Sequence, residues 1–155
     1  MTDRERLLRA DFEKLSRAIA LVVHSTERVQ PYDAERTYDP MELEPYDALS
    51  GRFERAVEVA LGKFFRSVEL FESGIPSDTV RDRLNGMRKL DLIADVELWL
   101  EMRGVRNRIA HDYLPEEIKV IYDDITQKYA VELRRLRSAA GEYVQRRSSH
   151  DAIAE

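Results

Sequence analysis

Four polar residues in one short segment, Arg103, Arg106, Asn107 and His111, are of types that could do chemistry together. An imidazole moves protons near neutral pH, and a planar guanidinium donates pairs of hydrogen bonds to phosphate oxygens. Attack by a ribose 2′-hydroxyl on the adjacent phosphate needs both a proton carrier and a fixed cation to stabilise the phosphorane. The residue types therefore suit phosphoryl chemistry in RNA, and this chemistry requires no metal.

A helix over this segment would place the four residues beside its buried side. At about 100° per residue, one sector of about 60° gathers the apolar side chains that must face the core, namely Leu98, Met102, Val105 and Ile109. Asn107 and His111 lie on a line far from that sector. Arg106 and Tyr113 lie on another line, at its edge, and Arg103 falls between the two lines. One helix supplies one such set, so a separate acid and base would require a two-fold axis between two copies.

An ordinary structural explanation competes with this interpretation. Arginines on an exposed helix face commonly form weak ion pairs, and Glu101 and Asp112 are close in sequence. Tyr113, judged on spacing alone, would be a packing residue at the rim of the core. Of the other histidines, His24 belongs to a helix surface and His150 to a polar tail, and neither has comparable neighbours.

Apolar residues at three- and four-residue steps predict helices along most of the chain. The first should begin with a capping box at Thr2 and Glu5 and end near Val29. Residues 30–45, with three prolines, should form a connector. The further helices are expected at 46–71, in a short stretch from Pro76 and Ser77, at 92–113, and from Pro115 onward. The polar tail after Tyr143 should fray.

These elements predict an all-α fold, a single domain over residues 1–155 built as an antiparallel bundle of about five helices. The chain is 35% charged, has a net charge of −5 and contains no cysteine. The absence of cysteine favours a cytoplasmic protein, and no apolar stretch is long enough to span a membrane. The acidic charge counts against a general nucleic-acid binder and restricts any RNA contact to a local arginine cluster.

The run from Arg106 to Tyr113, Arg-Asn-Arg-Ile-Ala-His-Asp-Tyr, resembles the Arg-x4-His-x-Tyr motif of HEPN-domain proteins. More narrowly, it is similar to the HepT branch of toxin–antitoxin systems. The likeness extends upstream to residues 74–77, 90–93 and 100–105, and in helix order it covers residues 50–140. The first helix and the connector lie outside this pattern.

The resemblance implies a homodimeric, metal-independent endoribonuclease toxin that uses no cofactor. Arg106 and His111 would be its catalytic pair, with Asn107 and Arg103 in support. Tyr113 matches the family tyrosine that a partner minimal nucleotidyltransferase, the antitoxin, can modify with AMP, and the added phosphate and bulk would then compete with RNA. In related families the same fold is instead a non-catalytic binding or substrate-presenting partner of a nucleotidyltransferase, and this alternative stays open.

Overall fold

The computed structural model describes the backbone of residues 1–111 and 114–154 and the side chains of residues 1–111 and 114–147. Over these residues it contains helices and no strand, which confirms the all-α prediction. In chain order the elements are α1 (Asp3–Thr26), α2 (Pro40–Val59), η1 (Ala60–Phe64), α3 (Phe65–Glu72), α4 (Val80–Lys89), α5 (Val96–His111), α6 (Pro115–Asp124), η2 (Ile125–Tyr129) and α7 (Ala130–Ala154). Because the π-helical turns η1 and η2 join their neighbours without a break, the described chain forms five helical rods.

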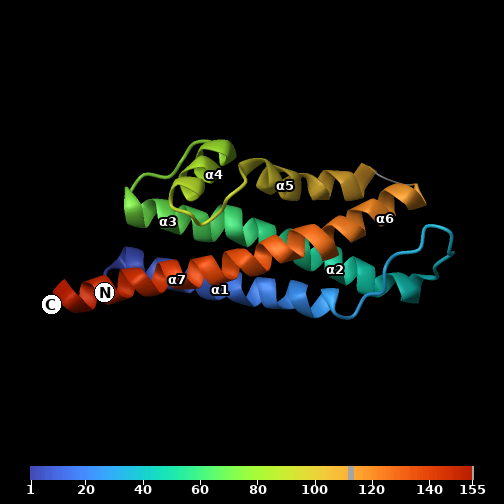
Figure 1. Ribbon diagram of the computed structural model, residues 1–155, viewed down its shortest axis with the longest axis horizontal. Coiled ribbons are helices and arrows are strands. Elements are labelled where there is room, and N and C mark those ends of the chain that lie inside the picture. The colour runs from blue at the N-terminus through green and yellow to red at the C-terminus, as the bar shows by residue number, and fades with distance from the viewer. Residues whose placement is uncertain (112–113, 155) are drawn as a thin grey trace.

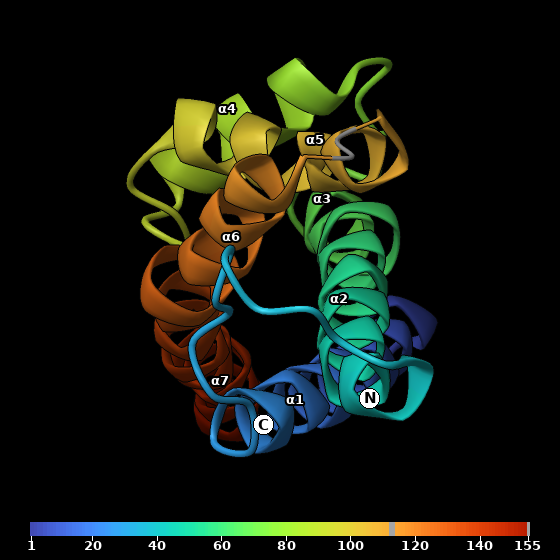
Figure 2. The same ribbon diagram turned by 90° about the vertical axis from the view of Figure 1, so that its right-hand side faces the viewer.

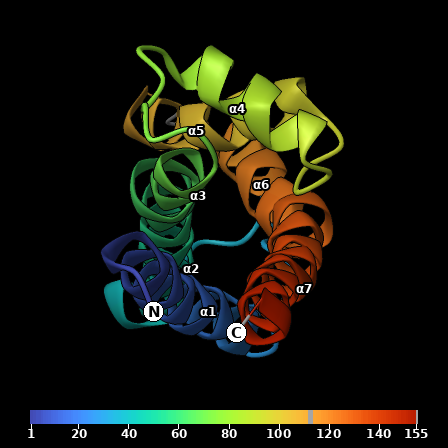
Figure 3. The same ribbon diagram turned by 90° about the vertical axis from the view of Figure 1, so that its left-hand side faces the viewer.

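The rods form an elongated bundle with both termini at one end (Figure 1). Helix α1 packs against α2, α3 and α7. Seen along the bundle, the rods α2–α3 and α6–α7 make two walls, and α4 and α5 cover the side opposite α1 (Figures 2 and 3). Helix α5 contacts α2, α4 and α6, so it is held between both walls.

Aromatic side chains join the walls to α5 inside the bundle. The Trp99 ring of α5 is fully buried and lies edge-on to Phe65 of α3, with 5.3 Å between the ring centroids. Its indole nitrogen donates to Glu132 Oε1 of α7 at 3.0 Å. Phe53 of α2 stacks on Tyr129 of η2 at 5.6 Å. The contacts of Trp99 fix the position of α5, which carries the polar strip identified in the sequence, and the Phe53–Tyr129 stack joins the two walls.

Two helices begin at residues other than those predicted, because capping residues outweigh the apolar pattern. The second helix begins at Pro40 rather than Tyr46, since Asp39 and Glu42 form a capping box and Pro40 occupies the first turn. Pro45 is accommodated inside this helix, so the connector is shorter than 30–45. The third helix begins at Val80 with Thr79 as its N-cap, not at Pro76.

The last two rods also differ from their predicted bounds. Helix α5 begins at Val96 rather than Leu92, after a turn in which Asp91 has φ 59°. The Asp95 carboxylate then accepts a hydrogen bond from the Leu98 amide at 3.1 Å. Pro115 opens α6 as predicted. Helix α7 continues past Tyr143 to Ala154, in a stretch whose polar sequence predicted fraying.

The two π-helical turns lie where buried residues repeat every fourth position. On the second rod the buried stripe is Leu49, Phe53, Val57, Leu61 and Phe65, and on the last it is Ile121, Ile125, Tyr129 and Leu133. In a regular helix of 3.6 residues per turn, a four-residue repeat drifts by about 40° per step. The wider π turn takes up most of this drift, which helps each stripe stay against the core.

The connector between α1 and α2 is held by a cluster of four tyrosines, Tyr32, Tyr38, Tyr46 and Tyr122. Their rings lie 4.8–5.7 Å apart, with Tyr32 stacked on Tyr38 at 4.8 Å and Tyr38 edge-on to Tyr46 at 5.7 Å. The Tyr46 hydroxyl donates to the carbonyl of Gln30 at 2.6 Å. The connector thus crosses the end of the bundle as an ordered segment between α2 and α6 (Figure 2).

Among the described helices, none is long and apolar enough to cross a membrane.

Candidate functional site

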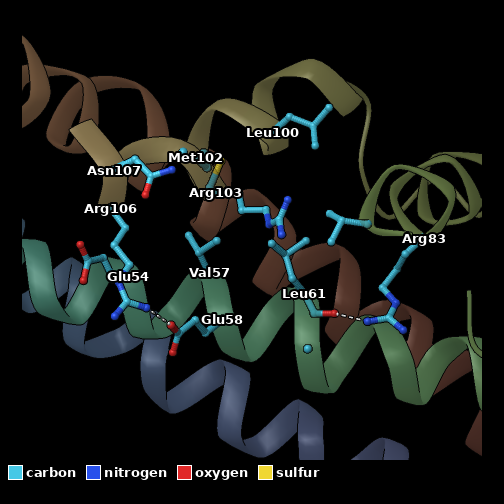
Figure 4. Close-up of a pocket in the computed structure, with 13 residues that line it drawn as sticks. Glu54, Val57, Glu58, Leu61, Arg83, Leu100, Met102, Arg103, Arg106 and Asn107 are labelled. Atoms are coloured by element: carbon cyan, nitrogen blue, oxygen red, sulfur yellow. Dashed lines mark hydrogen bonds and ion pairs between the residues drawn. The ribbon is translucent and has the colours of Figure 1, made fainter. Parts of the chain in front are cut away.

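A groove of about 650 Å³ lies between α2–η1 on one side and α4–α5 on the other. Figure 4 shows Arg103 and Arg106 extending from α5 toward α2. The side chains that line it are polar toward one end, and toward the other end apolar side chains lie beside one paired arginine, Arg83. The lining residues are Glu54, Val57, Glu58, Leu61, Gly62, Val80, Arg83, Leu100, Met102, Arg103, Gly104, Arg106 and Asn107.

Two carboxylates of α2 face Arg106 at the polar end of the groove. Arg106 Nη1 lies 3.5 Å from Glu58 Oε1, and the two side chains are 73% and 68% exposed, so this ion pair is weak. Glu54 lies one helical turn before Glu58. Its burial raises its pKa, the nearby charge of Arg106 opposes that shift, and repulsion from Glu58 adds to it. The polar end therefore holds one carboxylate that is poorly stabilised as an anion.

Arg103 and Asn107 complete this end of the groove from α5. Positions three and four apart on a helix lie on one face, so Arg103, Arg106 and Asn107 form a compact triangle of hydrogen-bond donors. The Arg103 side chain is exposed and makes no ion pair or hydrogen bond to any residue that the structure describes. The sequence predicted one polar strip of these three residues with His111, and the groove is lined by the three but not by His111.

A nearly buried arginine, Arg83 of α4, lies at the other end. Its Nε donates to Glu69 Oε1 at 2.6 Å and its Nη1 donates to the Leu61 carbonyl of η1 at 2.9 Å. Glu69 also accepts hydrogen bonds from the backbone amide and the hydroxyl of Ser77. The side chains of Arg83 and Glu69 are only 14% and 8% exposed, so the pair fixes α4 against α3 and η1.

Two helical glycines line the groove on opposite sides, Gly62 of η1 and Gly104 of α5. A Cβ atom added at either position would meet no other atom within 4 Å. Glycine inside a helix costs stability relative to alanine, and here no close approach of another residue requires it. What the two glycines provide is open space in the groove.

The other residues singled out in the sequence lie elsewhere. His111, at the end of α5, is exposed and is not among the residues that line the groove. Tyr113 and Asp112 lie outside the described residues, as does the side chain of His150. His24 lines a separate cavity at the end of α1.

The ordinary explanation was that the arginines of this helix form ion pairs with acids close in sequence. The described ion pairs of Arg106 and Arg108 instead join α5 to acids of other helices. Arg108 pairs with Asp124 of α6 at 3.3 Å. Glu101 instead binds Lys128 at 2.9 Å, and this hydrogen bond, which outweighs partial desolvation, lowers the pKa of Glu101. These pairs attach α5 to the last rod and leave Arg103 free of any carboxylate in the described part of the chain.

Sequence reasoning missed Glu54, Glu58, Glu69 and Arg83. The four-residue spacing of Glu54 and Glu58 beside the apolar stripe was a usable signal, because it places both acids on one face of the helix. Nothing in the sequence indicated that α4 and α5 would lie across from that face. The hydrogen bonds of Arg83 to Glu69 and to the Leu61 carbonyl likewise depend on how α4 packs against α3 and η1.

The groove is suited to binding. Its lining offers guanidinium, amide and carboxylate groups beside an apolar surface, and no histidine, serine, threonine or lysine is among its 13 residues. Among the described residues, no group of three or more histidine, aspartate or glutamate side chains could hold a metal ion.

A family model described as "Nucleotidyltransferase substrate binding protein like" matches residues 10–141. No curated protein and no solved structure matches the chain. The match overturns the assignment to the HEPN family and its HepT branch, which rested on a motif of a few residues. The predicted ribonuclease activity and toxin role are wrong for the same reason. The catalytic roles predicted for Arg106 and His111, from their residue types and from the resemblance, are not tested by the match.

The match covers most of the chain, including part of α1, all of the connector and the whole groove. It agrees with the alternative left open by the sequence, in which the fold is a partner of a nucleotidyltransferase. The match does not support the predicted homodimer or the predicted RNA substrate. This chain belongs to the family of nucleotidyltransferase substrate binding protein like proteins.

Proposed function

We propose that this protein is a non-catalytic partner of a nucleotidyltransferase and that its groove holds the substrate of that enzyme. The observation that carries the proposal is the groove itself, where Arg103, Arg106 and Asn107 meet an apolar surface in a volume within the usual range for small-ligand sites. The family description supports the same function.

The physical benefit of such a partner is proximity. A substrate held beside the active site of a bound enzyme reacts at a high effective concentration, and its orientation is fixed before the transfer. The partner then needs only a rigid site and a stable interface. The groove meets the first need, because α5 is fixed by Trp99 and α4 by the buried pair of Arg83 and Glu69.

Co-expression with a nucleotidyltransferase encoded next to this chain tests the partnership. We expect a stable complex on size-exclusion chromatography and a transfer rate higher than that of the enzyme alone. If no complex forms, or if the enzyme is equally active without this chain, the proposal is wrong.

Groove variants test whether the substrate lies where we place it. Combined Arg103→Ala and Asn107→Ala should leave the complex intact and raise the KM for the acceptor substrate by about tenfold or more, since a charge-assisted hydrogen bond is worth about 1.5–3 kcal/mol. The matched control is Arg66→Ala, at an exposed arginine of α3 that does not line the groove. Equal KM values for the groove variant and the control would place the substrate elsewhere.

A further inference from the structure

Resting on the proposed function, we propose that the ligand of the groove carries a phosphate group, which Arg103 and Arg106 bind together after Glu58 releases Arg106. The rest of the ligand lies over the apolar end of the groove. The substrate is then a phosphate-bearing compound, and the Glu58 carboxylate of α2 competes with its phosphate for Arg106.

The first support is the state of the two arginines. Arg103 presents a whole guanidinium group to solvent with no partner in the described part of the chain, and Arg106, three residues later, lies on the same face of α5. Two like charges at this spacing repel each other. An anion between them relieves the repulsion, and each guanidinium can donate two parallel hydrogen bonds to it.

The number of donors favours phosphate over carboxylate. The two guanidinium groups and the Asn107 amide line one groove from neighbouring turns of α5, and together they offer more donors than the two oxygens of a carboxylate can accept with good geometry. A terminal phosphate has three acceptor oxygens and carries close to two negative charges at neutral pH.

Glu58 competes for Arg106 in the empty groove. The contact is long, 3.5 Å, and both side chains are more than two-thirds exposed, so the ion pair is easily exchanged. A phosphate with twice the charge and better hydrogen-bond geometry displaces it. Glu54 lies beside the same guanidinium, and burial already raises its pKa, which means that its anionic form is disfavoured. A bound phosphate adds a further negative charge close to this carboxylate. Removing either negative charge therefore strengthens phosphate binding.

The apolar end accommodates the rest of the ligand. Leu61, Val80 and Leu100 line it, and the glycines at 62 and 104 keep it wide. A flat ring or short chain attached to the phosphate is desolvated there. A single inorganic phosphate gains nothing from this surface, so it binds more weakly than a phosphate monoester of suitable size.

Calorimetric titration of the full chain with AMP, adenosine and inorganic phosphate tests the proposal. We expect AMP to bind, and both adenosine and phosphate to bind at least tenfold more weakly. Arg103→Ala should weaken AMP binding by tenfold or more, and Glu58→Gln should strengthen it several-fold. If AMP does not bind, or if adenosine binds as well as AMP, or if Glu58→Gln binds AMP no better than the original chain, the proposal is overturned.

A steric variant tests the location without changing charge. Gly62→Leu fills the groove, whereas Gly51→Leu adds the same side chain at a glycine of α2 that also has open space around it but does not line the groove. Both should keep the far-ultraviolet circular dichroism of the original chain. We expect only Gly62→Leu to abolish AMP binding, and equal loss in both would refute the location. If transfer in the enzyme complex depends on the groove while no phosphate-bearing probe binds, the proposed function stands and this inference fails.

Discussion

Replacing Glu69 by glutamine should destabilise the bundle by about 2–3 kcal/mol and loosen α4. Glu69 accepts from Arg83 Nε on one oxygen and from the Ser77 amide and hydroxyl on the other. A glutamine has one acceptor oxygen, so its amide group must face either Arg83 or the Ser77 amide, and donor then meets donor. Breaking a fully buried ion pair costs about 3–5 kcal/mol, and the access of water to Arg83 from the groove reduces this.

Urea unfolding followed by circular dichroism measures the effect. With a slope of about 2 kcal/mol per molar urea for a chain of this size, the midpoint should fall by about 1–1.5 M. Glu13→Gln, at an exposed position of α1, is the matched control and should change the free energy of unfolding by less than about 0.5 kcal/mol.

The double variant Glu69→Leu with Arg83→Met separates the ion pair from general damage to the packing. It should be more stable than Glu69→Gln alone, because it leaves no uncompensated buried charge. A loss below 0.5 kcal/mol for Glu69→Gln, or strict additivity of the Glu69→Leu and Arg83→Met single variants, would refute the role assigned to this pair.

Three further predictions concern titration and the core. Because burial raises the pKa of Glu54, Glu54→Gln should be more stable than the original chain at neutral pH. The difference in the free energy of unfolding should shrink as pH falls and Glu54 becomes protonated. Urea melts at several pH values that show a constant difference would contradict this. Burial, with a smaller contribution from Tyr38, raises the pKa of Tyr46 to about 12. The free energy of unfolding should therefore fall as pH rises from about 10 toward that value, and tyrosinate absorbance should rise over the same range. Tyr46→Phe should reduce this dependence of stability on pH. Trp99→Phe removes the hydrogen bond to Glu132 and part of a fully buried ring, and thermal unfolding should show a loss of about 2 kcal/mol; an unchanged midpoint would mean that the core repacks without cost.

The class and helix order followed from the sequence because they depend on local periodicity. The capping box at Thr2 and the proline at 115 marked helix starts correctly, since both act through backbone groups within one turn. The start at Pro40 differs from the prediction because three nearby prolines favour a connector, although Asp39 with Glu42 carries the same capping signal as Thr2 with Glu5. Runs of apolar residues at four-residue steps, over 49–65 and 121–133, are present in the sequence, and they were the available sign of the π-helical turns.

The site was predictable only within one helix. Angular spacing placed Arg103, Arg106 and Asn107 together, because all three belong to α5. It could not supply Glu58 or Arg83, which reach the groove from α2 and α4 through tertiary packing. The motif that joined Arg106 to His111 gave a wrong function, because a short spacing pattern describes one face of one helix and not the chemistry across from it.

The π-helical turns affect how relatives of this chain can differ in length. Adding one residue to a regular helix rotates everything after it by about 100°, which moves a buried face toward solvent. At Ala60–Phe64 and Ile125–Tyr129 the chain already contains such an extra residue, absorbed within a single wide turn. A relative lacking that residue could keep the helix on either side in register by closing the turn. We therefore expect aligned members of the family to show single-residue gaps at these two turns, and few elsewhere in the long helices.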